Sequence, residues 1–470
     1  MPHPITHVQP PLEFIPPALN PLVLRAAQLS LPTWLRSRTN IAQIQAENLE
    51  TLVELYQQFQ AGKIRFLMAF RHPSTDDPLC MAYLLSYLVP QAARQQGTAL
   101  QYPIHAHFIY DRGIPLWAGS QVGWLYSRLG GTPIHRGKLD RVGLRSARDL
   151  FVNGKLPMAA APEGATNGHN GIVSPLEPGI SQLGFWCVED LVNAGRSEQV
   201  FIVPIGIQYR YVEAPWKSLS KLLTQLEAAS GLSTVVPANS TQDISTEQAI
   251  YHRLYRLGEH LLSLMEEFYT HFDRQPLLTA ATKVEAFTTE VLDADEQFAA
   301  RLQALLNRAL QVAEQYFGIQ PKGSLIDRCR RLEQAGWDWI YREDIKHIEA
   351  LPPLERGLAD RIAEEASLKM WHMRLVESFV AVTGKYVQEK FTVERFAETT
   401  LLMWDTVTRM SGGNPFRRPY LGKQSVQITV GQPISVSDRW ETYQANRRSA
   451  KLAVTDLTCD LQAALVKTIG

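Results

Sequence analysis

The segment RHPSTDDP at residues 71–78 places a carboxylate, Asp77, five positions after a histidine, His72. The apolar residues 64–70 before it are typical of a buried strand, so His72 is expected at the C-terminal end of that strand, where open α/β sheets place their sites. A carboxylate bonded to one imidazole nitrogen fixes the tautomer and makes the other nitrogen a better base. We therefore expect His72 to take the proton of an attacking alcohol, with Asp77 as its orienting group.

Two further segments carry residue types suited to binding a polar acceptor. After a run of small residues, the carboxylate of Glu163 can accept hydrogen bonds from hydroxyl groups, and Gly164 lets the backbone approach a ligand. Residues 130–137 (GGTPIHRG) place the guanidinium of Arg136 just past a short expected strand, a position suited to phosphate. Taken alone, each segment is better explained as an ordinary turn. Residues 203–207 (VPIGI) are expected to line the core.

In their order and spacing, these four segments resemble the four sequence blocks of the glycerolipid acyltransferase superfamily, which includes glycerol-3-phosphate and lysophosphatidic acid acyltransferases. The resemblance covers roughly residues 40–215 and 423–470. It implies an acyl thioester donor (acyl-CoA or acyl-carrier protein), a lipid or glycerol-phosphate acceptor, no resident cofactor and no metal. The residues to which it gives roles are His72 as general base, Asp77 as its partner, Arg136 as phosphate ligand, and Glu163 and Gly164 as the acceptor block.

Three positions depart from the usual pattern of that family. Ala161 stands where phenylalanine is usual, Thr166 where arginine is common, and Glu177 where a lysine is often found. A doubly charged phosphate generally needs more than one cation near it. The acceptor is therefore either a phosphate monoester held largely by Arg136 or an alcohol without a free phosphate monoester.

Other function classes have less support in the sequence. A serine hydrolase would need a Gly-x-Ser-x-Gly elbow, which is missing, and Leu139 stands where a P-loop needs serine or threonine. His105 and His107 with Asp111 suggest a metal site but lack further ligands at readable spacing. The alternative to an enzyme is a non-catalytic, membrane-associated lipid-binding protein on an acyltransferase scaffold.

Composition narrows the choice of partners. Lysine plus arginine and aspartate plus glutamate number 47 each, and this neutral balance argues against a nucleic-acid binder. The 4 cysteines are widely spaced, as expected for reduced thiols in a cytoplasmic protein. The N-terminus has no signal-peptide pattern, and no apolar stretch reaches the roughly 18–20 residues of a spanning helix. We expect a cytoplasmic protein peripheral to a membrane.

The elements that must position these residues follow an α/β pattern. Strand-like runs alternate with helical ones up to about residue 215, whereas residues 245–410 are almost entirely helical in pattern. Residues 425–430 (SVQITV) again predict a strand. The expected fold is a mostly parallel sheet flanked by helices and interrupted by a large helical insertion. The expected divisions are a proline-rich N-terminal segment at 1–39, the α/β domain at 40–215 and 423–470, and the insertion at 216–422.

Two local expectations concern the N-terminal third. The apolar spacing over residues 40–59 predicts a helix. Residues 21–38 combine leucines, one tryptophan and only arginine as charged type, so they are either a membrane contact through Leu31, Trp34 and Leu35 or a helix packed on the protein. Pro32 argues against one long interfacial helix.

Overall fold

The computed structural model describes residues 5–135, 140–232, 245–273, 294–345, 347–379, 385–415 and 417–469. Two compact units make up the chain. The sheet unit comprises Glu13–Glu213 and Lys423–Gly470, and the helical unit comprises Met1–Leu12 and Ala214–Gly422. The segment expected as one piece at 1–39 is thus divided between the two units after Leu12.

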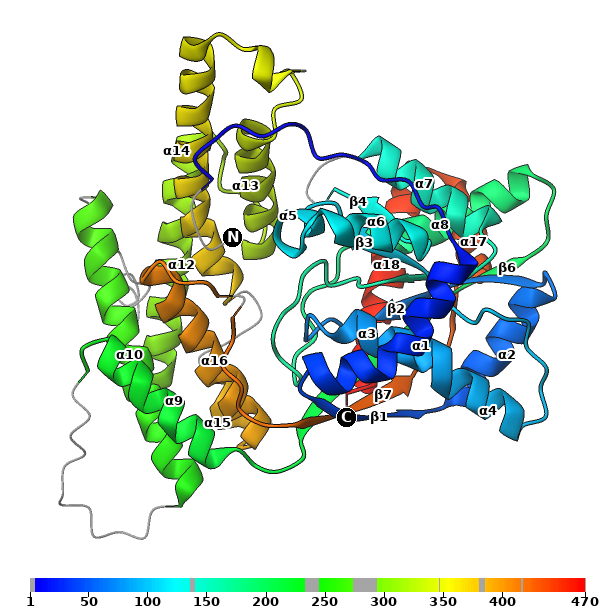
Figure 1. Cartoon of the computed structure of the whole chain (residues 1–470), viewed down its shortest axis with the longest axis horizontal. Coiled ribbons are helices and arrows are strands. Elements are labelled where there is room, and N and C mark those ends of the chain that lie inside the picture. Colours follow the sequence, from blue (N-terminus) through cyan, green and yellow to red (C-terminus); the bar gives the residue numbers. More distant parts are fainter. Residues whose placement is uncertain are drawn as a thin grey trace. The chain divides into compact units, whose positions relative to one another are not determined.

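A mixed, mostly parallel sheet runs through the sheet unit, with helices on both of its faces (Figure 1). Its order is β1-β7-β6-β2-β5-β3-β4, with β8 paired to β6. The pairs that β2, β3, β4, β5 and β6 form with one another are parallel. β7 and β8 run antiparallel to β6, and β7 runs parallel to β1. The predicted α/β class with a mostly parallel sheet is confirmed. The strands are β1 (Ile41–Glu47), β2 (Ile64–Phe70), β3 (His107–Asp111), β4 (Thr132–Ile134), β5 (Met158–Ala160), β6 (Gln199–Tyr211), β7 (Gln424–Val430) and β8 (Ile434–Ser435).

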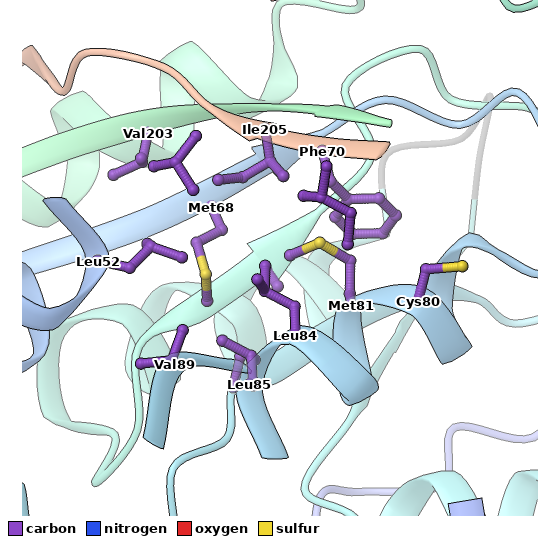
Figure 2. Packing of buried hydrophobic residues seen from close by; sticks show 14 of the residues in the cluster. Leu52, Met68, Phe70, Cys80, Met81, Leu84, Leu85, Val89, Val203 and Ile205 are labelled. Atoms are coloured by element: carbon purple, nitrogen blue, oxygen red, sulfur yellow. The ribbon is translucent and has the colours of Figure 1, made fainter. Parts of the chain in front are cut away.

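The central strand β2 is buried on both faces of the sheet. Its alternate residues Phe66, Met68 and Phe70 join one hydrophobic cluster, and Leu67 and Ala69 join the other. Figure 2 shows the first cluster, in which strand side chains meet those of the helical segment below. Helices on this face are α1 (Pro21–Arg38), α2 (Leu49–Gln60), α3 (Asp77–Tyr83), a π-helical turn (Leu84–Leu88) and α4 (Val89–Gln95). Helices on the other face are α7 (Arg141–Asn153), α8 (Gly179–Asn193) and α18 (Arg447–Lys467).

Burial of β2 gives the segment that follows it, from Arg71 onward, a rigid base. Each large apolar side chain contributes roughly 1.5–3 kcal/mol when it is fully buried, so displacing this strand would cost many such contributions.

The remaining α-helices of the sheet unit are α5 (Ile114–Ala118), α6 (Ser120–Arg128) and α17 (Trp440–Ala445).

The helix predicted over residues 40–59 is wrong in its first half. The structure forms β1 there and begins α2 only at Leu49. The two elements meet at Asn48, whose φ of 57° is a left-handed conformation that asparagine tolerates. Pairing with β7, from the far end of the chain, supplies the backbone bonds of β1. Periodicity within a local window contains no information about that partner.

Helix α1 continues through Pro32, which we expected to interrupt it. A proline inside a helix leaves the carbonyl four residues earlier without its amide donor. That carbonyl belongs to Gln28, and it accepts a hydrogen bond of 2.6 Å from the hydroxyl of Tyr87. A donor from another element therefore replaces the missing amide, which explains why the helix persists.

The prediction that Leu31, Trp34 and Leu35 of α1 contact a membrane is partly wrong. Leu31 and Leu35 are buried in the sheet unit's core. The exposed apolar side chains of the helix are instead Leu22, Leu29 and Trp34, with exposed fractions of 81%, 61% and 54%. A membrane contact through α1 would have to use these three residues.

The helical unit has its own hydrophobic core, in which residues of the first segment of the chain take part. The backbone amide of Gln9 donates to the carbonyl of Ile340 at 2.8 Å, and the amide of Val8 donates to the carboxylate of Asp360. The helices are α9 (Trp216–Ala229), α10 (Thr246–Asp273), α12 (Ala294–Phe317), α13 (Leu325–Ile340), α14 (Pro353–Glu377), α15 (Tyr386–Glu389) and α16 (Val393–Met410). In the part of the chain that the structure describes, no helix has the length and apolarity needed to cross a bilayer.

Candidate active site

The site is built around His72, the second residue after the end of β2, and Asp77, the first residue of α3. His72 Nδ1 lies 3.0 Å from Asp77 Oδ2. The same oxygen accepts the backbone amide of Ser74 at 2.8 Å, and Oδ1 accepts the hydroxyl of Tyr209 at 2.6 Å. Both carboxylate oxygens are therefore fixed, and the imidazole is fixed through them.

The turn that brings the two residues together is closed by Ser74 and by Asp77 itself. The residue before α3 is Asp76, and its side chain makes no capping bond. Ser74 Oγ instead accepts the amide of Asp76 at 3.2 Å within the turn. Asp77 can fold back over this turn because its own carboxylate bonds to the Ser74 amide.

Burial shapes the chemistry around Asp77, which is completely shielded from solvent. Burial, and then the nearby Asp77 charge, raise the pKa of Tyr209 well above its usual value, so this hydroxyl stays protonated as a donor. The same two causes raise the pKa of the Cys80 thiol. They also raise the pKa of the neighbouring Asp76 to about 6.

The second imidazole nitrogen of His72, Nε2, is not bonded to the carboxylate and is the ring atom suited to act as a base. A carboxylate only accepts hydrogen bonds, so Nδ1 carries the proton and Nε2 carries the lone pair. Nε2 lies 3.0 Å from the hydroxyl oxygen of Thr166, whose residue is exposed. The side chain of His72 is 20% exposed. The ring is therefore partly open to solvent, and the exposed Thr166 lies at its Nε2 end.

Glu163, predicted to bind acceptor hydroxyls, has both oxygens engaged within the protein. Oε1 accepts the backbone amide of His72 at 2.8 Å, and Oε2 accepts Asn167 Nδ2 at 2.7 Å and the amide of Ser174 at 2.9 Å. The residue is 1% exposed and forms an ion pair with Arg71 at 3.7 Å. In this arrangement Glu163 positions the His72 segment, and its contact with an acceptor stays a prediction.

Arg71 is a further site residue to which the sequence motifs gave no role. It is fully buried, and its guanidinium donates to the carbonyls of His169, Asn170 and Ile172. A buried charge is tolerated when it is paired and hydrogen-bonded in this way. An arginine directly after an apolar strand was the signal that could have identified it.

Gly164 and Arg136 complete the predicted set. Gly164 has a φ of +71°, and a Cβ there would lie 2.2 Å from Glu177 Oε1. The position therefore requires glycine for the turn after Glu163, whether or not a ligand approaches it. Arg136, with its predicted phosphate contact, lies outside the described residues.

The histidines considered as metal ligands make other bonds. His105 Nε2 lies 3.1 Å from the carbonyl oxygen of Leu129, and His107 Nδ1 lies 2.8 Å from that of Gly130. Burial lowers the pKa of His105 to about 4, so this ring is neutral. Asp111 accepts the amide of Gly113. Among the residues whose positions are described, no group of three or more His, Cys, Asp or Glu side chains is arranged to hold a metal ion.

Comparisons with known proteins give no family for this chain. No protein-family model matches it, and no curated protein matches it. A functional assignment therefore depends on the geometry around His72 and on the order of the sequence motifs.

Proposed function

We propose that this protein is an O-acyltransferase of the glycerolipid acyltransferase type. It moves a fatty acyl group from a thioester, acyl-CoA or acyl-carrier protein, to the hydroxyl of a glycerolipid acceptor. The observation that carries the proposal is the arrangement of His72, with Nδ1 3.0 Å from the Asp77 carboxylate and Nε2 3.0 Å from a hydroxyl oxygen. The helical residues between β6 and β7 are, in this proposal, an insertion in the acyltransferase domain.

The chemistry requires one base and one leaving thiol. Nε2 of His72 takes the proton of the attacking hydroxyl while its oxygen bonds to the thioester carbonyl carbon. The C–S bond then breaks, and the thiolate takes the proton back from the imidazole. Asp77 stabilises the imidazolium formed in between, because its carboxylate is fixed 3.0 Å from Nδ1.

The acceptor and the membrane location belong to the same proposal. A glycerolipid acceptor lies in a bilayer, and α1 offers a surface suited to one. The helix contains no acidic residue, its charges are Arg25, Arg36 and Arg38, and Leu22, Leu29 and Trp34 are exposed. Arginines with exposed apolar side chains suit the headgroup region of an anionic membrane.

The proposal is tested by acyl transfer from palmitoyl-CoA and palmitoyl-carrier protein to glycerol-3-phosphate, lysophosphatidic acid and a lysophospholipid without a free phosphate monoester. We expect His72→Ala to lower turnover by about 10²–10⁴ with unchanged folding, because the general base is lost. Asp77→Asn should also impair turnover, since it favours the wrong tautomer. Products are measured by mass spectrometry.

His252→Ala is the matched control, since His252 is an exposed histidine of α10 in the helical unit. It should leave turnover unchanged. If His72→Ala transfers acyl groups at the wild-type rate, the mechanism is wrong. If the wild type consumes no thioester with any acceptor, the non-catalytic lipid-binding alternative replaces the enzyme.

A further inference from the structure

The hydroxyl of Thr166 completes a chain of three groups with the geometry of a nucleophile, a base and an orienting acid. Thr166 Oγ1 is 3.0 Å from His72 Nε2, and His72 Nδ1 is 3.0 Å from Asp77 Oδ2. Both distances lie within hydrogen-bond reach, as an activated hydroxyl nucleophile requires. Thr166 is exposed, so an acyl donor can reach its oxygen.

The protein holds Thr166 at this place from both sides. Three residues before it, the Glu163 carboxylate accepts the His72 amide at 2.8 Å. Directly after it, the backbone amide of Asn167 donates to the His72 carbonyl at 3.1 Å, and Asn167 Nδ2 binds Glu163 at 2.7 Å. Arg71 forms an ion pair with Glu163 at 3.7 Å. The short distance between Thr166 and His72 is therefore a consequence of four groups that fix the loop.

We propose that Thr166 is a catalytic nucleophile and that acyl transfer proceeds through a threonyl ester. This inference rests on the proposed acyltransferase function and replaces the direct attack of the acceptor hydroxyl on the thioester by two successive steps. It makes the reaction a double displacement, in which the donor thiol leaves before the acceptor alcohol reacts.

In the first step Thr166 Oγ1 bonds to the thioester carbonyl carbon and its proton passes to His72 Nε2. The C–S bond breaks, and the thiolate leaves as a thiol with that proton. In the second step the acceptor hydroxyl gives its proton to Nε2 and its oxygen bonds to the ester carbonyl carbon. The bond between that carbon and Thr166 Oγ1 breaks, and Oγ1 takes the proton back. No oxidant, reductant or further reactant is needed.

Thiol exchange without any acceptor tests the first step in isolation. The full-length protein is incubated with palmitoyl-CoA and isotopically labelled CoA, and in parallel with palmitoyl-carrier protein and labelled carrier. A threonyl ester lets the label enter the acyl thioester, whereas direct transfer to an acceptor does not. We expect exchange by the wild type and by Thr166→Ser, at least 100-fold slower exchange by Thr166→Val, and a palmitoyl adduct on the Thr166 peptide after acid quench.

Thr455→Val, at an exposed threonine of α18, is the matched control and should exchange like the wild type. Transfer to an acceptor by Thr166→Val at the wild-type rate, with no exchange by the wild type, would overturn the threonyl ester but leave the acyltransferase proposal standing. Wild-type protein that neither exchanges nor transfers from either donor would overturn both. Loss of transfer in Thr166→Val without exchange in the wild type would also overturn the ester, since Thr166 would then only position His72.

Discussion

Adjacent carboxylates, Asp76 and Asp77, have different environments at the start of α3. The carboxylate of Asp77 is held in position by hydrogen bonds with His72, the backbone amide of Ser74 and the hydroxyl of Tyr209. Burial, and secondly the Asp77 charge, raise the pKa of Asp76 to about 6. The folded protein therefore holds the Asp76 proton more tightly than the unfolded chain does.

The raised pKa of Asp76 predicts a loss of stability as pH rises from about 4 to about 6. In this window the folded state binds more protons than the unfolded state, so the free energy of unfolding falls with pH. Asp76→Asn has no proton to lose, so its stability relative to the wild type should increase by about 2 kcal/mol between pH 4 and pH 7. Urea unfolding of both proteins across this range measures the difference.

Asp456→Asn, at an exposed aspartate of α18, is the control for this pH series. It should follow the wild-type curve. If the Asp76→Asn and wild-type stabilities change in parallel with pH, Asp76 is not the group responsible.

Part of the site was predictable because its residues are close in the sequence. His72 and Asp77 are 5 residues apart, and a strand followed by a helix suffices to bring them together. Thr166 and Tyr209 are 94 and 132 residues from the groups they bind, and only the sheet places them there. Glu163 was found as a carboxylate near the site, but its partners, which are two backbone amides and the side chains of Asn167 and Arg71, could not be read from residue type.

At the scale of elements, local patterns gave the correct type where an element's own residues decide it. The runs ending at Phe70 and Val430 are strands as predicted, because buried β-branched and aromatic residues favour them. The wrong predictions concern elements whose type or extent depends on a partner that is distant in the sequence. β1 depends on β7, and α1 survives Pro32 because Tyr87 supplies a donor.

Helix α1 also carries the prediction about membranes. Changing Leu22, Leu29 and Trp34 together to serine should weaken binding to vesicles containing anionic lipid by roughly 10- to 100-fold, because each apolar side chain loses a contribution of the order of 1 kcal/mol. Vesicle flotation measures the bound fraction. High salt should weaken wild-type binding as well, since the arginines of α1 contribute through charge.

Leu452→Ser with Val466→Ser, at exposed apolar positions of α18, controls for a general loss of surface hydrophobicity. These changes should leave flotation unaltered. Equal flotation of the wild type and the triple α1 variant would exclude α1 as the contact. Polar changes at the buried Leu31 and Leu35 are unsuitable for this test, because they would damage the core.

At the scale of the whole molecule, the two chain segments that lead into the helical unit leave the sheet side by side. The amide of Val212 donates to the carbonyl of Lys423 at 2.9 Å, and Tyr211 pairs with Gln424 in the antiparallel ladder. Their ends are therefore close enough to be joined by a tight hairpin.

We expect a shortened chain that begins at Glu13 and joins Val212 to Lys423 through Asn-Gly to fold. The sheet unit keeps both of its core clusters in this chain, so it should unfold in one cooperative urea transition with a free energy of about 5 kcal/mol or more. Circular dichroism during urea unfolding measures this. The same chain ended at Val212 lacks β7 and α18 and should not fold. A non-cooperative transition of the joined chain would show that the sheet unit depends on the residues removed.

The pairing of β7 with β1 and β6 also sets an order of events during biosynthesis. β1 and β6 are complete once Tyr211 has left the ribosome, but the strand that lies between them ends at Val430. At about 5–20 residues per second, synthesis of the intervening residues takes roughly 10–40 s. For that time the edge of β6 from Ile205 to Tyr211 presents backbone N–H and C=O groups without their β7 partners. We therefore expect chaperones that recognise unpaired strands to bind a nascent chain of this protein near the ribosome.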